Sequence, residues 1–176
     1  MTAKLRIFLA ALGLALPLDQ LSKLWVASHA AYGIPRPVIE GLFYLTYVRN
    51  PGAAFSLFAG APEAWRVGGF IGLTGVAILA ILSFLRRLEP GDRLSAAALG
   101  LILAGALGNL IDRVRFKEVV DFLDFRLIGG YVWPTFNLAD SFIVVGTTFL
   151  VLTLFLQPSE GEAEGARKAA SASPDA

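Results

Sequence analysis

The chain has 176 residues, of which 56% are hydrophobic and 16% charged, with a net charge of +1 and a mean hydropathy of +0.65. Soluble domains carry about 25% charged residues, so this composition indicates a membrane protein, and its length suggests one domain. The near-neutral charge gives no indication of a nucleic-acid partner. The sequence contains no cysteine, which excludes disulfides and thiol catalysis, and its one histidine, His29, cannot build a histidine-rich zinc site. We therefore predict no metal and no other cofactor.

Residues about 5–27 are predicted to form a first, uncleaved membrane span. A secretory signal peptide cleaved near Ser28–Ala30 is an alternative. However, Asp19 would lie about 21 Å along a helix that starts at Leu5, in the far third of a ~30 Å hydrocarbon core. Asp19 and Lys23 are four residues apart with the acid first, the favourable order for a helical ion pair that neutralises both charges at the membrane edge.

Residues about 33–60 are predicted to form a small β-cradle that lies on the membrane. Proline and glycine interrupt this region, and the aromatic run Leu42–Val48 is typical of a strand. A turn at 50–52 and a second short strand at Ala53–Phe58 are expected to follow. Glu63–Arg66 is predicted as a short interfacial helix.

Three further apolar stretches are predicted to span the membrane, at about 67–85, 94–112 and 138–156. Residues 1–157 then form a single domain with four spans, and 158–176 is predicted to be a disordered cytoplasmic tail, because it lacks core-forming residues. Counting lysine and arginine on the two sides does not decide the orientation. The basic residues before the first span and the Arg86-Arg87 pair favour a cytoplasmic N-terminus.

Polar residues gather where three of these spans reach the membrane face that carries the cradle. Asn109, Asp112 and Arg113 end the third span, and they fit either a polar helix end whose arginine reaches the headgroups or a substrate-binding site. Asn137 is placed to cap the fourth span, with Asp140 as its third helical residue, favoured by the helix dipole.

Asp121 lies in an apolar run just beyond the third span, and Asp124 follows three residues later. In an extended chain these two side chains point to different faces, so one is expected to point into the protein and the other into water. Two aspartates brought close together share one proton, because both cannot ionise. One can then act as a general base on a water molecule and the other as a general acid, which hydrolyses a peptide without serine, cysteine or metal.

With these residues assembled, the chain resembles the lipoprotein signal peptidase (signal peptidase II) family over residues 5–157. The resemblance depends on five motifs in order: Asp19-Gln20-Leu21-Ser22-Lys23, Val48–Ser56, Gly105–Arg113, Val119-Val120-Asp121-Phe122 and Phe136–Ser141. One small departure is Ala104, where the family often carries a second glycine.

The resemblance implies an intramembrane aspartic endopeptidase of the bacterial cytoplasmic (inner) membrane, with four transmembrane helices, an extracytoplasmic β-cradle and its active site at the outer leaflet. Such an enzyme removes the signal peptide of a prolipoprotein by cutting before a cysteine that carries diacylglyceryl. It acts within the lipid bilayer, and we expect it to be a monomer. By motif match, Asp121 and Asp140 would be the catalytic pair. The residues that would bind substrate or support the site are Asp19, Lys23, Asn50, Gly52, Gly108, Asn109, Asp112, Arg113, Asn137 and Ala139.

Two other functions were weighed against this one. A proton-coupled transporter or channel subunit would use Asp19, Asp112 and Asp140 as a relay, but the acids gather at one membrane face and the sequence has no internal repeat. A serine intramembrane protease would use His29, but no Gly-x-Ser-x-Gly motif is present and His29 is expected in a solvated loop.

Overall fold

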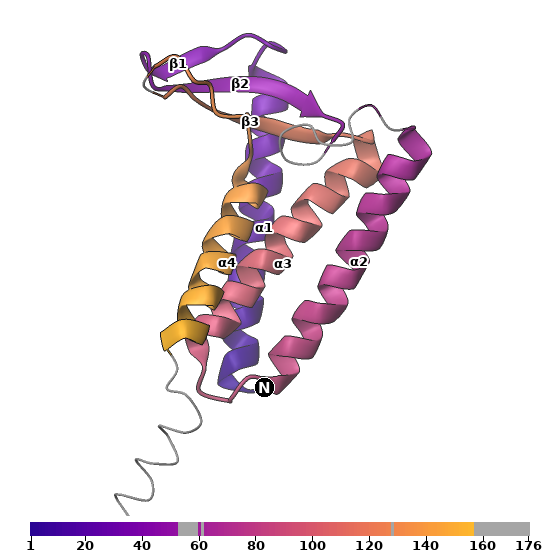
Figure 1. The fold of residues 1–176 in the computed structure, drawn as a ribbon, viewed down its shortest axis with the longest axis vertical. Coiled ribbons are helices and arrows are strands. Elements are labelled where there is room, and N and C mark those ends of the chain that lie inside the picture. Colours follow the sequence, from indigo (N-terminus) through magenta and orange to yellow (C-terminus); the bar gives the residue numbers. More distant parts are fainter. Residues whose placement is uncertain (53–59, 61, 128, 157–176) are drawn as a thin grey trace, which may run out of the picture.

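A computed structural model describes residues 1–52, 60, 62–127 and 129–156 of the chain. The described part forms four helices: α1 (Ala3–His29), α2 (Glu63–Arg87), α3 (Arg93–Phe116) and α4 (Leu138–Leu156). The helices run lengthwise, and a small sheet lies across one end of them, as Figure 1 shows. This arrangement places the chain among membrane-type folds with several apolar helices.

The helices agree with the predicted spans and extend a few residues beyond most of them. Among the described residues, α1, α2 and α3 are long and apolar enough to cross a membrane, and α4 contributes a shorter apolar stretch, 138–153. The separate interfacial helix predicted at Glu63–Arg66 is wrong, because these residues form the first turn of α2. The backbone N–H of Arg66 bonds the carbonyl oxygen of Pro62 at 3.0 Å, and the helix continues through Gly68 and Gly69, since no proline interrupts it.

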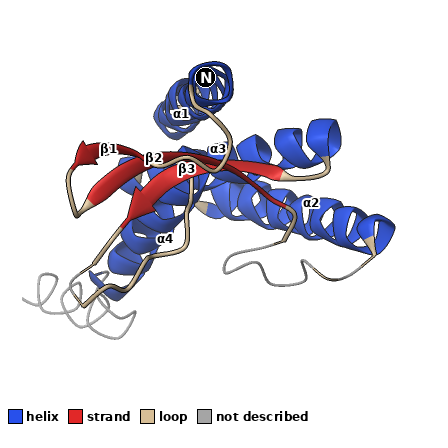
Figure 2. Ribbon diagram, turned by 90° about the horizontal axis from the view of Figure 1, so that it is seen from above, coloured by secondary structure: helices blue, strands red, loops and turns tan. Residues whose placement is uncertain are grey.

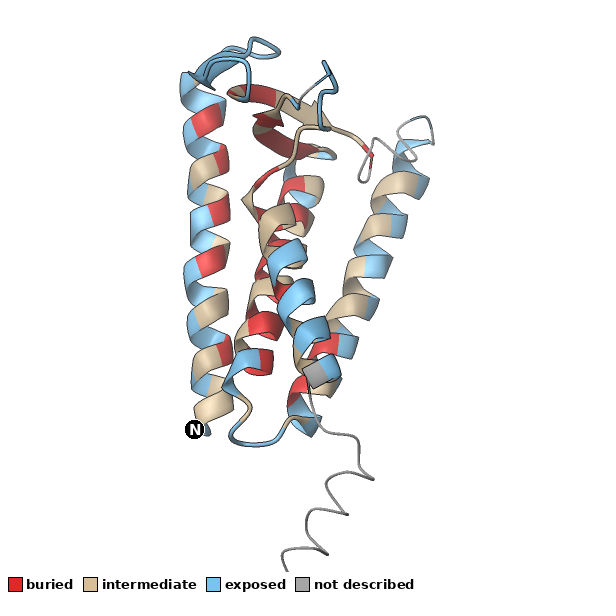
Figure 3. Cartoon of the chain, turned by 60° about the vertical axis from the view of Figure 1, so that its left-hand side comes forward, coloured by how far each residue is buried: buried red, intermediate tan, exposed pale blue. Residues whose placement is uncertain are grey.

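Helix α3 is the central helix, since α1, α2 and α4 each pack against it. The buried side chains at the end away from the sheet come from α1, α2 and α3 and include Phe8, Ile81, Leu85, Leu99 and Leu103. Figure 3 shows how the buried residues concentrate on the inner faces of the helices, while α2 stays exposed over most of its length. Small residues where two helices meet allow those helices to approach each other closely.

The sheet has three antiparallel strands in the order β1 (Arg36–Ile39), β2 (Phe43–Asn50) and β3 (Val119–Phe125). The predicted strand at 42–48 is β2, whereas the predicted strand at Ala53–Phe58 lies outside the described residues. In the described sheet, β2 pairs with β1 and with β3, and β3 follows α3 some seventy positions later in the chain. Seen from above in Figure 2, the strands cross the helix ends between α1 on one side and α2 and α4 on the other.

Helix α1 is an integral part of this fold. It contacts α3 along its length, and its residues Asp19, Lys23 and Val26 are buried among α3, α4 and the sheet. The predicted signal-peptide alternative would remove these buried groups from the bundle.

The close packing of α3 against α4 gives a first prediction. A Cβ atom added at Gly105 would collide with the backbone carbonyl of Ala139 and come within 2.7 Å of the Ile143 side chain. We expect Gly105→Ala to destabilise the folded protein by about 1–3 kcal/mol, because backbone cannot move aside cheaply. Thermal unfolding of the purified protein in detergent measures the effect.

The matched control is Gly72→Ala in α2, where an added Cβ would meet no atom within 4 Å. This variant should unfold at the wild-type temperature or slightly above it, since alanine favours a helix. Equal unfolding temperatures for the two variants would contradict the close contact at Gly105.

Candidate active site

Two carboxyl groups from distant parts of the chain line one cavity beneath the sheet. Asp121 comes from β3 and Asp140 from the first turn of α4, and the cavity has a volume of about 660 Å³. Asp121 is 2% exposed, and Asp140 is half-buried. Asn50, Asn109 and Arg113 line the same cavity. The structure therefore brings together the two acids that the motif match had paired.

Asp121 is held by amide groups from two other elements. Its carboxylate accepts hydrogen bonds from Asn50 Nδ2 at 3.1 Å and from Asn137 Nδ2 at 2.7 Å. Asn50 is in turn fixed by the turn that follows β2, because its Oδ1 accepts from the backbone N–H of Gly52 at 2.9 Å. Both oxygens of Asp121 thus have a defined orientation toward the cavity.

Asp140 is held by the capping interaction at the start of α4. Asn137 Oδ1 accepts from the Asp140 backbone N–H at 3.0 Å, and Asp140 Oδ2 accepts from the Asn137 backbone N–H at 3.3 Å. This reciprocal pair is a capping box, and it confirms the predicted cap. It fixes the position of Asp140 relative to Asn137, which also contacts Asp121.

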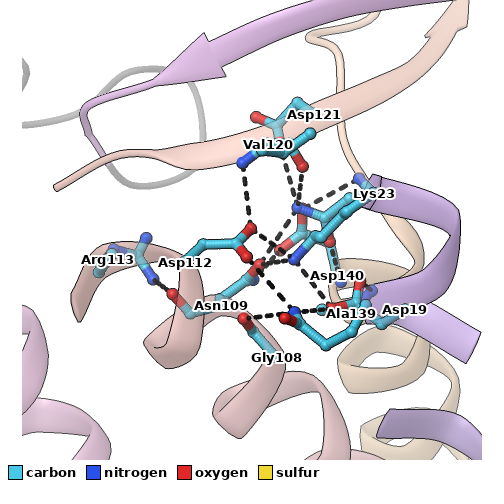
Figure 4. A network of polar contacts seen from close by, with 12 residues as sticks. Asp19, Lys23, Gly108, Asn109, Asp112, Arg113, Val120, Asp121, Ala139 and Asp140 are labelled. Atoms are coloured by element: carbon cyan, nitrogen blue, oxygen red, sulfur yellow. Dashed lines mark hydrogen bonds and ion pairs between the residues drawn. The ribbon is translucent and has the colours of Figure 1, made fainter. Parts of the chain in front are cut away.

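Asn109 connects Asp140 to the remaining polar groups. Its Oδ1 accepts from Lys23 Nζ at 3.0 Å and from Asn137 Nδ2 at 3.2 Å, so its Nδ2 must face the other way and donates to Asp140 Oδ1 at 2.8 Å. Figure 4 shows this network from close by. The orientation of the Asn109 amide is therefore determined by a lysine that does not itself touch either cavity acid.

Lys23 is the centre of a buried cluster of charges. Its Nζ lies 2.9 Å from Asp19 Oδ2, which confirms the predicted ion pair, and also 2.9 Å from Asp112 Oδ2. The other oxygen of Asp19 accepts from the backbone N–H of Ala139 at 2.8 Å. Asp112 Oδ2 also accepts from the backbone N–H of Val120 at 3.1 Å. The cluster thereby ties α1 and α3 to the beginnings of β3 and α4.

Two residues of this cluster show what spacing alone identifies poorly. Gln20, which belongs to the first motif but is not among the predicted site residues, donates from Nε2 to the Gly108 carbonyl at 3.1 Å and to both Asp19 and Asp112. An atom added at Gly108 would collide with the Asp19 carboxylate, so this glycine is required for space. A glutamine beside an acid has no periodic signal in sequence, and only the helix packing reveals its role.

Arg113 supports the opposite wall of the cavity. Its guanidinium lies 4.3 Å from the centre of the Phe70 ring and donates to the carbonyls of Gly52, at 3.3 Å, and Asn109, at 3.5 Å. Its Nε atom is buried without a protein partner in the described part of the chain. Of the two alternatives left open for Arg113, this position at the cavity favours substrate binding over contact with headgroups.

The expectation that Asp121 or Asp124 would face water is wrong. Asp124 is 5% exposed, and its Oδ2 accepts from Thr46 Oγ1 at 2.7 Å and lies 3.6 Å from Arg126. The two acids do point to opposite faces of β3, but both faces are covered. The face that carries Asp124 also carries Phe122, which packs with Val26 of α1. Asp124 does not line the cavity.

The environment of Asp121 alters its acidity. Burial, together with the nearby charge of Asp140, raises the pKa of its carboxyl from the usual 3.8 to about 7. Hydrogen bonds from Asn50 and Asn137 and the positive charge of Lys23 act in the opposite direction. A carboxyl with this pKa exchanges a proton readily near neutral pH, which suits acid–base chemistry.

The described residues contain no group of three or more acids or histidines able to hold a metal ion. His29 ends α1 instead of lying in the predicted loop, and its exposed ring stacks on Trp25. Its Nδ1 is 2.8 Å from Ser28 Oγ, but that hydroxyl also bonds backbone carbonyls of the same helix. Neither residue lines the cavity.

Known proteins resemble this chain over most of its length. The sequence profile of the signal peptidase (SPase) II family matches residues 11–156. A lipoprotein signal peptidase of Syntrophus aciditrophicus (strain SB) is 47% identical over 160 residues, which cover 91% of this chain and 99% of that protein. One of Moorella thermoacetica is 46% identical over 147 residues, covering 84% and 91%.

Two solved structures of bacterial membrane enzymes share the fold. The structure at 2.3 Å resolution has a TM-score of 0.75 and covers 87% of this chain and 93% of that one, with 30% identity. The structure at 1.9 Å resolution has a TM-score of 0.76 and covers 86% and 94%, also with 30% identity.

The raised pKa of Asp121 gives a second prediction. Between the usual value of 3.8 and the folded-state value of about 7, the folded protein binds a proton that the unfolded chain has released. The free energy of unfolding therefore falls as pH rises through this window. We expect Asp121→Asn to have a larger free energy of unfolding than wild type above pH ~7, by on the order of 1–4 kcal/mol, and hence a higher unfolding temperature. This difference should vanish near pH ~4.

The exposed Glu89 provides the control, because Glu89→Gln should show no stability difference that grows with pH. Thermal unfolding in detergent across this pH range makes the comparison. If the stability difference between wild type and Asp121→Asn is the same at both ends of the pH range, the raised pKa is contradicted.

Proposed function

This chain belongs to the signal peptidase II family, and we propose that it acts as an intramembrane aspartic endopeptidase on bacterial prolipoproteins. The observation that carries the proposal is the placement of Asp121 and Asp140 in one cavity. Asn137 donates a hydrogen bond to Asp121, and Asn109 donates one to Asp140. The protease function is a property of the family, and the aspartic mechanism is our inference from this pair.

The mechanism uses the two carboxyl groups as a unit that holds one proton. The unprotonated member takes a proton from a water molecule, whose oxygen attacks the carbonyl carbon of the scissile peptide. The protonated member gives its proton to the carbonyl oxygen, which yields a tetrahedral diol. The carboxyl group that took the water's proton then gives a proton to the departing nitrogen, while the other carboxylate takes a proton from one diol hydroxyl as the carbonyl re-forms. The C–N bond then breaks, one water has been added, and the pair again holds one proton.

The remaining site residues position this pair and the substrate. Asn109 and Asn137 orient the acids, and the cluster of Asp19, Lys23 and Asp112 orients Asn109. We propose that Arg113, with its unpaired Nε, binds a carbonyl of the substrate. The supporting set is completed by Asn50, Gly52, Gly108 and Ala139.

The shape of the cavity supports a lipid-modified substrate. Its polar end carries the acids, while Ile143, Val144 and Val145 of α4 form an apolar wall that continues along the helix. Acyl chains of a diacylglyceryl-cysteine would lie along that wall, with the scissile bond before the cysteine held next to the carboxyl groups. The signal peptide that is removed is an apolar helix, which matches the lipid environment of the bundle.

We propose four spans with both termini on the cytoplasmic side of the inner membrane. Helix α4 has 19 residues and is thus about 28 Å long, close to the ~30 Å hydrocarbon core. Lys4 donates to the backbone carbonyls of Arg86 and Leu88, so the start of α1 and the α2–α3 turn lie at one end. The arginines of that turn favour the cytoplasm, which puts the cavity at the outer leaflet.

The third prediction is that Asp121 and Asp140 act as one unit. With purified protein and a diacylglyceryl-modified prolipoprotein, Asp121→Asn and Asp140→Asn should each lose at least about a thousandfold in turnover. The double variant should be hardly slower than either single one, because removing one member already disables the pair. The same prolipoprotein without its lipid should remain uncut by the wild type.

Asp124→Asn is the matched control, since Asp124 is equally buried on the opposite face of β3 and outside the cavity. Its folded fraction should cleave at close to the wild-type rate. Rapid cleavage by folded Asp121→Asn, together with loss of cleavage in Asp124→Asn, would mean that we have paired the wrong acids. Retention of activity in all three variants would remove the aspartic mechanism.

The fourth prediction concerns orientation and uses the absence of native cysteine. In intact spheroplasts, a cysteine at exposed Pro35 should react with a membrane-impermeant maleimide, and one at exposed Gly91 should react only after permeabilisation. The reverse pattern would place the cavity on the cytoplasmic face.

A further inference from the structure

A basic cluster lies at the end of α3, away from the cavity. The guanidinium of Arg49 is 4.9 Å from the centre of the Phe116 ring, and that of Arg115 is 5.2 Å from the same centre. Two cations thus share one aromatic ring, an arrangement whose mutual repulsion favours a nearby anion.

The cluster is a product of the chain reversal between α3 and β3. Arg115 and Phe116 end α3, and Lys117 adopts a left-handed conformation with φ of 63° that turns the chain toward β3. Antiparallel pairing then sets Arg49 of β2 opposite Val120 of β3. In Figure 1 the end of β2 lies above this end of α3. Both arginines are therefore positioned by backbone structure and not by flexible loops.

No carboxylate in the described part of the chain forms an ion pair with either arginine. Arg49 donates from Nε to the Tyr47 hydroxyl at 3.0 Å, which leaves its terminal nitrogens for another acceptor. Glu118 influences Arg49 electrostatically but does not come within the 4.0 Å of an ion pair. Arg115 is exposed, and Arg49 is half-buried.

A small hollow of about 30 Å³ adjoins the two arginines, with Lys23 and Asp112 in its wall. Lys23 is already paired with Asp19 and Asp112, so the positive charge that remains for a ligand is that of Arg49 and Arg115. The oxygens of Asp112 are already bonded to Lys23, Gln20 and the Val120 backbone, so they offer little to a further cation. A hollow of this size admits about one oxygen atom of a ligand, with the rest of the group on the rim.

One wall of the hollow belongs to an exposed apolar face of α1. Leu24 of α1 lines it and is 50% exposed, and Leu21, one turn earlier on the same face, is also exposed. A positive pocket above an exposed apolar helix face, at the depth where the spans end, is the arrangement that binds anionic lipid headgroups. A soluble anion would make no use of this apolar surface.

We propose that Arg49 and Arg115 bind the phosphodiester group of an anionic membrane phospholipid whose acyl chains lie along α1. Guanidinium groups match phosphate oxygens in pairs, and Phe116 holds the two groups at a fixed separation. None of the residues that line this hollow also lines the cavity with Asp121 and Asp140. The bound lipid is therefore distinct from the substrate, and it stabilises the junction of β2, β3 and α3.

The test is thermal unfolding of the full chain in a neutral detergent, titrated with dioleoyl-phosphatidylglycerol. This lipid should raise the unfolding temperature, and phosphatidylcholine and soluble glycerol 3-phosphate at equal concentration should not. The double variant Arg49→Gln/Arg115→Gln should need roughly tenfold or more lipid for a half-maximal shift, since charge-assisted hydrogen bonds are lost.

The matched control is Arg36→Gln/Arg87→Gln, which removes two exposed positive charges elsewhere and should respond as wild type does. If both double variants weaken equally, the lipid recognises overall charge and the proposal is wrong. An equal response to phosphatidylcholine would exclude headgroup recognition, and an equal response to glycerol 3-phosphate would exclude a lipid. Should the double variant fail to fold, Arg115→Gln, exposed at a helix end, decides the question by the same measurement.

Discussion

The site depends on one buried ammonium group. Lys23 is 3% exposed and lies 2.9 Å from two carboxylates that are themselves almost fully buried. Removing charges from water is costly, and a buried ion pair is often no more stabilising than apolar side chains of the same volume. Removing one partner, in contrast, typically costs about 3–5 kcal/mol, because it leaves an uncompensated charge. The cluster is therefore better understood as a means of fixing geometry than as a source of stability.

The cluster fixes the geometry of the site because each of its charged groups can hydrogen-bond in one direction only. The ammonium group can only donate, so the Asn109 oxygen must face it and the Asn109 amide must face Asp140. The carboxylates of the cluster can only accept hydrogen bonds, and each accepts one from a backbone N–H group. Asp112 therefore fixes the start of β3 and Asp19 the start of α4. These are the two segments that carry Asp121 and Asp140. A lysine on the first helix thus helps to determine where two acids, 98 and 117 residues later in the chain, are placed.

Residue spacing predicted the helices and the local contacts well. The pair of Asp19 with Lys23 and the cap of Asn137 on Asp140 each act over three or four residues, where helix geometry is known in advance. Long-range packing was not accessible in the same way. The pairing of β2 with β3, the burial of Asp124 and the contacts of Gln20 depend on which surfaces meet, and no local pattern encodes them. The pairing of Asp121 with Asp140 came from motif resemblance, not from spacing.

The two faces of β3 show why one strand can carry acids with different consequences. Asp124 Oδ2 accepts from a hydroxyl and lies 3.6 Å from Arg126, so a positive charge stands beside it, whereas its Oδ1 is buried without a partner among the described residues. Asp121 faces an acid across the cavity and receives only neutral amide donors directly, so its carboxyl retains a proton near neutral pH. Strand alternation separates the two environments over three residues. A buried acid next to a second acid destabilises the fold, and such a cost is expected where the strain serves chemistry. Of the two acids on β3, Asp121, which faces a second acid, is thus the one that chemistry would use.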